Sequence, residues 1–187
     1  MRIQTLALVL LLTSSFAENA LAQHSGSHQG HGQPGPNYAA LVTRTVKALS
    51  EEQISDLRAA KGMGLALAAE LNGYPGPLHV LQLAEQLGLT PSQRAEIQLQ
   101  IDDMKRDVRA LGDELIALET ELDRQFASRS ITPASLDHVT GQIGQKQAAL
   151  RSAHLKYHLS TVATLSGAQV RQYNVLRGYE ERQEPRP

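Results

Sequence analysis

The sequence predicts an all-α protein built on a long antiparallel helical hairpin with short flanking helices. The first observation is an apolar residue at every third or fourth position from Ile97 to Leu122, which is the heptad spacing of a packed helical seam. The second is a pair of helix-start signals, Thr90-Pro91 and Thr132-Pro133, each followed by a long periodic stretch. The third is the low aromatic content of 4%, which is thin for a globular core and normal for helices packed through Leu, Ile and Ala.

The first long helix is predicted from Pro91 to about Ala127. Thr90 can cap its first turn, and Gln93 can reach back to the Thr90 N–H to complete a capping box. Its seam consists of Ile97, Ile101, Met104, Val108, Leu111, Leu115, Leu118 and Leu122. The break at residues 128–130 is too short for anything but an antiparallel hairpin.

The second long helix is predicted to start at Pro133 and to keep the three-four rhythm. Its apolar set is Leu136, Val139, Ile143, Leu150, Ala153 and Tyr157, interrupted by Lys146. Counting from a turn near Ser130 places Gly112 opposite Ala148 and Ala149, and Gly144 opposite Ala117. We expect these small residues to let the two helix backbones approach each other.

Short helices are predicted on both sides of the hairpin. Expected ranges are 38–49, 51 to about 62–64, 65–71, 78–87 and 167 to about 176. Ser50 with Gln53 and Ser166 with Gln169 form the capping boxes of two of these helices. The helical domain is therefore predicted over residues 38–179, followed by a charged, proline-containing tail at 180–187 that we expect to be disordered.

The first 22 residues match a signal peptide. A positive Met1-Arg2 start precedes the apolar run 6–12, and the small residues around Ala22 suit cleavage there. The apolar run is far shorter than the roughly 20 residues that a bilayer requires, so we expect no stable membrane insertion. Export of a chain with 0 cysteines suits a bacterial periplasmic protein better than a small secreted domain that needs disulfides. A periplasmic location is predicted.

Residues 23–37 read QHSGSHQGHGQPGPN and are predicted to form a disordered tail. The tail contains His24, His28 and His31. Short His-rich tracts in exported proteins can bind Zn²⁺, Ni²⁺ or Cu²⁺ through neutral imidazoles, and a solvated linker that happens to contain His is the alternative.

A second candidate metal site lies in the hairpin. His154 and His158 are four residues apart on one helical face, with Asp103 and Asp107 roughly opposite them. Imidazole and carboxylate pairs on facing helices are how helical bundles build metal sites. The alternative is a set of solvated polar side chains, because the seam assigns Asp107 and His154 to flanking positions. The chain requires no cofactor on this reading, and Zn²⁺ is the candidate metal.

Composition and motifs argue against several function classes. The formal net charge of −1 gives no strong field to attract nucleic acid or an anionic membrane. No arrangement of Ser, His and Asp suggests a nucleophile with its base, and no Gly-rich phosphate loop joins a strand to a helix. We therefore expect no enzymatic activity.

The pattern Leu-Ser/Thr-x-x-Gln occurs three times, as LSEEQ at 49–53, LTPSQ at 89–93 and LSGAQ at 165–169. Each copy is physically a helix start. Two copies that flank a long hairpin, behind a signal peptide and a His-rich segment, resemble the LTxxQ family of periplasmic stress proteins. That family includes the Spy and CpxP chaperones, the zinc-resistance-associated protein and the periplasmic heavy-metal sensors. The resemblance covers residues 78–179.

The resemblance implies an all-α hairpin paired into a curved homodimer, without catalysis. A heptad seam on a helix too long for its hairpin partner to cover also predicts a dimer. The function implied is ATP-independent chaperone binding of unfolded or misfolded periplasmic proteins during envelope stress. The alternative is heavy-metal binding, resistance or sensing, with zinc as the metal. A sensor of this family carries a His-x-x-x-His pair ahead of the first LTxxQ; the matching positions here are Val80 and Ala84, with His79 nearby.

Overall fold

The computed structural model describes residues 38–180. The chain divides into two units, Met1–Asn37 and Tyr38–Pro187; the predicted signal peptide, the His-rich tail and residues 181–187 lie outside the described residues. The described elements are a 3₁₀ turn η1 (Tyr38–Leu41), α1 (Glu51–Arg58), α2 (Leu67–Glu70), α3 (Pro77–Gln82), α4 (Pro91–Ala127), α5 (Pro133–Thr164) and α6 (Gly167–Leu176). None of these helices combines the length and apolar character needed to cross a membrane.

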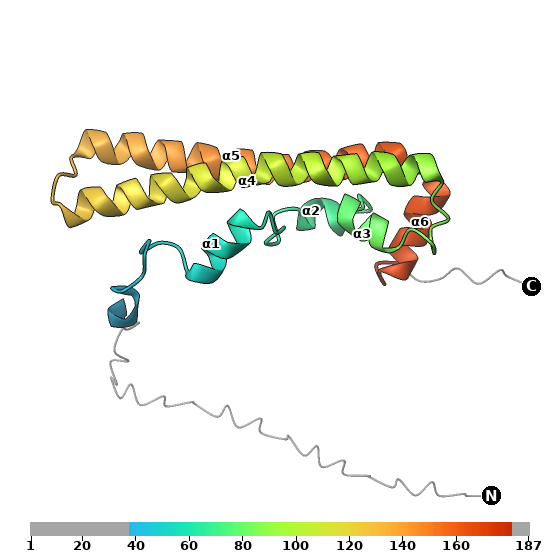
Figure 1. Ribbon diagram of the computed structural model, residues 1–187, viewed down its shortest axis with the longest axis horizontal. Helices are drawn as coiled ribbons and strands as arrows, with labels where there is room; N and C mark the ends of the chain where they lie inside the picture. The colour runs from blue at the N-terminus through green and yellow to red at the C-terminus, as the bar shows by residue number, and fades with distance from the viewer. Residues whose placement is uncertain (1–37, 181–187) are drawn as a thin grey trace, which may run out of the picture. The chain divides into compact units, whose positions relative to one another are not determined.

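The predicted antiparallel hairpin is confirmed. Helices α4 and α5 run side by side over their whole length (Figure 1). The Thr90 hydroxyl accepts from the Gln93 N–H at 3.2 Å while the Gln93 side chain accepts from the Thr90 N–H at 3.0 Å. The second helix starts with an equivalent box on Thr132. Arg129, at φ +56°, turns the chain between the two helices. Local side-chain chemistry therefore sets where both long helices begin.

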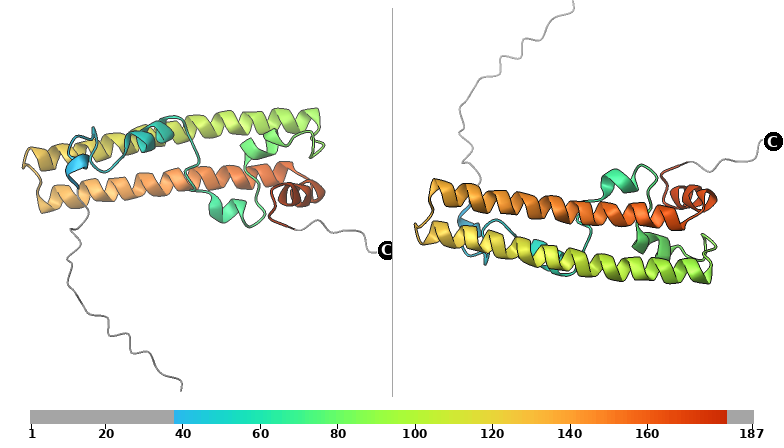
Figure 2. Two further views of the ribbon diagram at one scale, coloured as in Figure 1. Left: turned by 90° about the horizontal axis from the view of Figure 1, so that it is seen from below. Right: turned by 90° about the horizontal axis from the view of Figure 1, so that it is seen from above.

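The short helices pack along the hairpin, and α6 also contacts the α2 and α3 segments through Tyr173. In Figure 2, α1 lies over α4 and α2 lies beside α5, while α3 contacts both long helices. Three of the predicted short helices are wrong in length. Only η1 forms within 38–49, the helix after Ser50 ends at Arg58, and the 78–87 helix ends at Gln82. The early end of α1 coincides with Ala60, which adopts φ +55° and is buried, so tertiary packing ends the helix before the expected glycines.

The heptad seam of α4 is covered within one chain. Ile97, Ile101 and Val108 are at most 2% exposed. Leu111, Leu118 and Leu122 are partly buried and pack against the core cluster that contains Val108. The cover comes from α5 together with α1 and α3. The seam residues Ile97, Ile101 and Val108 are therefore buried without a second chain, and the dimer stays a prediction.

Gly112 and Gly144 also do not act as predicted. A Cβ at Gly112 would lie 3.1 Å from the carbonyl oxygen of Leu57, so Gly112 admits the backbone of α1. A Cβ at Gly144 would meet nothing within 4 Å. The small residues therefore do not draw α4 and α5 together; one of them seats α1 on α4.

The LTPSQ and LSGAQ boxes meet at the end of the hairpin where α6 follows α5. The Gln93 Nε2 donates to the Gln169 Oε1 at 2.9 Å, and the Gln169 Nε2 donates back to the Gln93 Oε1 at 3.0 Å. The same Nε2 atoms also donate to the carbonyls of Thr164 and Leu87. Each glutamine thus caps its own helix and ties that helix to the other box through its amide nitrogen, which a glutamate at the same position could not donate.

Candidate functional site

A pocket of about 350 Å³ opens between the hairpin and the segment that joins α1 to α3. Its walls are mostly apolar and include Ala60, Pro77 and Ile101. Its remaining side chains include donors for a metal ion: His79, His154, His158, Met63 and Met104. The described residues contain four histidines and two methionines, so three of those histidines and both methionines line one pocket.

His154 carries the most informative atom of the pocket. The residue is only 4% exposed, and its Nε2 is buried without a hydrogen-bond partner in the described structure. Burial lowers the pKa of His154 below its usual 6.5, and the proximity of His158 lowers it further. The ring is therefore neutral at pH 7, with a buried polar atom that no protein group satisfies. A buried atom of this kind costs roughly 1–3 kcal/mol unless a ligand or water meets it.

His158 lies one turn further along α5 and is 8% exposed. Its Nδ1 is 2.6 Å from the carbonyl oxygen of Tyr74. A carbonyl only accepts, so Nδ1 carries the proton and donates it, which leaves a lone pair on Nε2 in the neutral ring. The ring packs against Gly76, where a Cβ would come within 2.9 Å of its Cε1. Backbone contacts therefore fix both the tautomer and the position of this imidazole.

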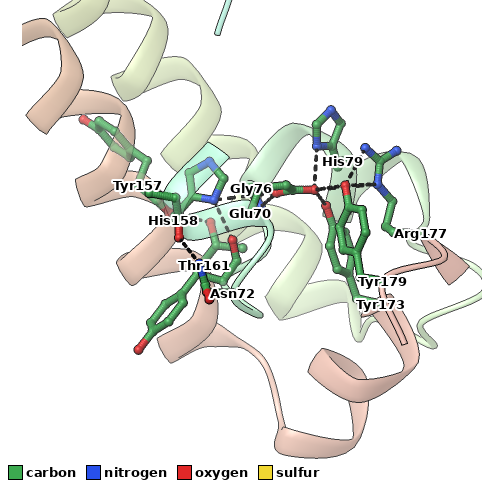
Figure 3. A network of polar contacts seen from close by, with 12 residues as sticks. Glu70, Asn72, Gly76, His79, Tyr157, His158, Thr161, Tyr173, Arg177 and Tyr179 are labelled. Carbon is green, nitrogen blue, oxygen red and sulfur yellow. Dashed lines mark hydrogen bonds and ion pairs between the residues drawn. The ribbon is translucent and has the colours of Figure 1, made fainter. Parts of the chain in front are cut away.

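Glu70 forms a buried polar cluster beside the pocket (Figure 3). The carboxylate is 5% exposed and accepts hydrogen bonds from the Tyr173 hydroxyl, the Tyr179 hydroxyl at 3.1 Å and the Gly76 N–H at 3.1 Å. Arg177 lies 3.6 Å away, and the Nδ1 atoms of His79 and His158 lie 3.4 and 3.7 Å away. The cluster joins the α2 segment to both α5 and α6.

The surroundings of Glu70 hold it in the charged form. Burial alone would raise its pKa, but neighbouring His79, the Tyr173 hydroxyl and the Gly76 N–H together lower it to about 2. Burial and the bond to Glu70 raise the pKa of Tyr173, so that hydroxyl remains a donor. The carboxylate is thus ionised and its oxygens are already engaged, which makes Glu70 a structural anchor next to the pocket.

The candidate site residues predicted from the sequence differ in where the structure places them. His24, His28 and His31 lie outside the described residues. His154 and His158 lie together on one face of α5, and both are buried, so the alternative of a solvated pair is wrong. This burial arises because the α1–α3 segment covers that face of the hairpin in addition to the two-helix seam.

The two aspartates predicted opposite these histidines are engaged elsewhere. Asp103 accepts from Arg106 at 2.7 Å, and Asp107 accepts from the Tyr157 hydroxyl at 2.8 Å. Among residues 38–180, no three side chains of His, Asp or Glu are already gathered around one point that could hold an ion. The structure therefore brings the two histidines together with other pocket residues and not with the aspartates.

Sequence reasoning missed Glu70, His79 and both methionines as site residues. Met104 belongs to the apolar seam, and nothing in the spacing distinguishes a thioether from a leucine at such a position. Glu70 had one weak signal, because it is a lone carboxylate within the apolar stretch from Leu65 to Leu71. Its partners on α6 are about a hundred positions away along the chain, so only the fold brings them together.

The fold and the paired boxes define a helical-hairpin protein of the LTxxQ type. Residues 63–172 match the model of the heavy-metal resistance family, and because this is more than half of the chain, the protein belongs to that family. The family is part of the LTxxQ group of periplasmic proteins related to Spy and CpxP. No curated protein and no solved structure matches the chain.

Proposed function

We propose that this protein binds a transition-metal ion in the pocket between the hairpin and the α1–α3 segment, as part of heavy-metal resistance in the periplasm. The observation that carries the proposal is the buried, unpartnered Nε2 of neutral His154 in a pocket that two further histidines line. Only a neutral imidazole ligates a metal, and imidazole suits Zn²⁺, Cu²⁺ and Ni²⁺.

His154 and His158 are the residues that would hold the ion. Their spacing of four positions on one helix turns both rings to the same side, and both line the pocket. The bond from His158 to Tyr74 leaves its Nε2 free for the metal. Further ligands would come from other pocket side chains or from water. Glu70 contributes by holding the surrounding segments in place rather than by ligation.

Titration calorimetry with Zn²⁺ and Ni²⁺ would test the proposal. The mature chain should first carry Ala at His24, His28 and His31, so that the tail adds no binding. Adding His154→Gln to this background should weaken binding by about 100-fold, since it removes a direct ligand. His138→Gln, an exposed histidine on the same helix, is the matched control and should change nothing. Equal binding by the His154→Gln variant would contradict the assignment.

Client binding is a second candidate function, and exposed apolar side chains support it. Met63, Leu67, Leu71, Tyr74 and Leu78 are each at least 40% exposed and fall within one short segment. Concentrated apolar exposure of this kind is typical of surfaces that bind other proteins. We propose that this segment captures unfolded periplasmic proteins without ATP.

Suppression of aggregation of an unfolded client would test this second function. The paired change Leu67→Ser with Leu71→Ser should abolish most of the suppression at equal protein concentration. Leu159→Ser, at an equally exposed leucine on α5, is the control and should leave suppression unchanged. If the paired change has no effect, the segment does not bind clients.

A further inference from the structure

Both sulfur-containing side chains of the described residues line the proposed metal-binding pocket. Met63 and Met104 both line it, and the sequence contains no cysteine to supply a thiolate. Met104 is 8% exposed and comes from α4, opposite the helix that carries His154. Met63 is 41% exposed and lies on the segment after α1. The two thioether sulfurs, the softest metal ligands in residues 38–180, therefore line the same pocket as the unpartnered His154 imidazole.

Thioether sulfur discriminates among metals. It is a soft, uncharged ligand that selects Cu(I), whereas carboxylates and water suit harder cations. We propose that the pocket takes copper as Cu(I), with the Met104 thioether and the His154 imidazole as its principal ligands. This inference rests on the proposed function, metal binding in this pocket, and adds the identity of the ion.

The charge of the pocket points to the same ion. Most of its lining is apolar, and the cost of burying an ion in such surroundings rises with the square of its charge. Lys105 also lines the pocket, and its positive charge opposes a second positive charge on the ion, whereas Lys61 is already paired with Asp56 at 2.7 Å. Glu70 offers little compensation, because Arg177 and two tyrosine hydroxyls already engage it. A monovalent cation with uncharged N and S ligands meets these conditions better than a divalent one.

The two methionines differ in burial. Met104 is nearly buried and lines the same pocket as the unpartnered His154, while Met63 is partly open to solvent. The ring of His79 also lines the pocket, with its Nδ1 3.4 Å from the Glu70 carboxylate. We therefore expect Met104 to contribute more to Cu(I) affinity than Met63.

The test is an anaerobic titration of the mature chain with Cu(I), in competition with a colorimetric Cu(I) chelator. The tail histidines should again be replaced by Ala. Met104→Leu conserves volume in the core and should keep the fold, which circular dichroism and the Tm would check. We expect this variant to lose at least about tenfold in Cu(I) affinity while its Zn²⁺ affinity stays within about threefold of the unchanged chain. Met63→Leu should lose less.

X-ray absorption at the copper edge identifies the ligand atoms around the copper, which an affinity measurement does not. Copper bound to the unchanged pocket should show sulfur as well as nitrogen scattering, and the sulfur signal should weaken in Met104→Leu. If Cu(I) binds Met104→Leu as tightly as before, or if only nitrogen and oxygen surround the copper, the inference is wrong while metal binding stands. The proposed function itself fails if neither copper nor zinc binds the chain with Ala at the three tail histidines. It also fails if the His154→Gln variant binds both metals with the same affinity as that chain.

Discussion

Buried polar groups differ between the end of the hairpin where the two LTxxQ boxes meet and the pocket under the α1–α3 segment. At the boxes, Gln93 and Gln169 use their amide oxygen and nitrogen on each other, on a cap N–H and on a carbonyl. In the pocket, the Nε2 of His154 has no partner although the residue is 4% exposed. The first region uses its polar groups to hold helices together, and the second leaves one available to a ligand.

The Glu70 cluster shows that this availability is local. Glu70 lines the same pocket, yet its carboxylate accepts several hydrogen bonds and joins α2 to α6. Satisfied and unsatisfied groups thus lie next to each other. The Nε2 of His154 lines a pocket where a ligand can reach it, unlike the buried unpartnered oxygens of Gln125 and Asn174, which do not line that pocket.

The largest expected effect is on Glu70. Glu70→Ala leaves Tyr173, Tyr179 and the Gly76 N–H without their acceptor, and it leaves Arg177 beside an apolar space. We expect a loss of about 3 kcal/mol in the free energy of unfolding, measured by urea denaturation. Glu85→Ala removes a carboxylate that is 87% exposed and should change stability by less than about 0.5 kcal/mol. Equal effects of the two changes would mean that the cluster does not anchor α2.

The charge of Glu70 predicts a pH dependence of stability. Its pKa is about 2 in the folded chain against an ordinary 4.5, so its contribution is complete above 4.5 and is lost as pH falls from 4.5 towards 2. Other carboxylates also titrate in this range, so the measurement is the difference between the unchanged chain and Glu70→Gln. That difference should shrink by roughly 2 kcal/mol between pH 6 and pH 2.5. A difference that stays constant would show that the Glu70 charge contributes nothing.

The two kinds of capping box provide a matched pair. Gln93→Ala removes a box bond together with the bonds to Gln169 and Thr164, whereas the hydrogen bonds described for Gln53 stay within its own box. We expect Gln93→Ala to cost about 1.5 kcal/mol and Gln53→Ala about 0.5 kcal/mol in thermal or urea unfolding. Combining Gln93→Ala with Gln169→Ala should cost less than the sum of the single changes, because the two amides share bonds. If the two losses in unfolding free energy add in full, Gln93 and Gln169 do not share the hydrogen bonds described between them.

The helix starts could be predicted because their chemistry is local. A cap side chain and the N–H that it bonds are three residues apart, so Ser50, Thr90 and Ser166 reveal their role in the sequence. The hairpin followed from the three-four spacing and the short break at 128–130. The ends of the short helices did not follow, because packing against α4 and α5 decides them.

The candidate site could be predicted only in part. The spacing of His154 and His158 identified two of its residues, but the heptad seam placed His154 in solvent. A two-helix seam describes only the α4–α5 contact, and the α1–α3 segment buries a further face that heptad positions do not represent. The contact between Glu70 and Tyr173 spans 103 positions, and no local pattern records such a pairing.

The smallest expected effect is the one that most directly tests the contrast. If the Nε2 of His154 is unpaired in the metal-free protein, replacing the ring with an apolar side chain should relieve an unmet desolvation cost. We expect His154→Leu to raise the free energy of unfolding by about 1 kcal/mol when chelator is present, although most core changes destabilise. His138→Leu, at an exposed position on the same helix, should leave stability within about 0.5 kcal/mol. A destabilised His154→Leu protein under these conditions would show that the nitrogen already has a partner, such as a bound water. A stabilised variant that no longer binds metal would show that this position gives up stability for ligand binding.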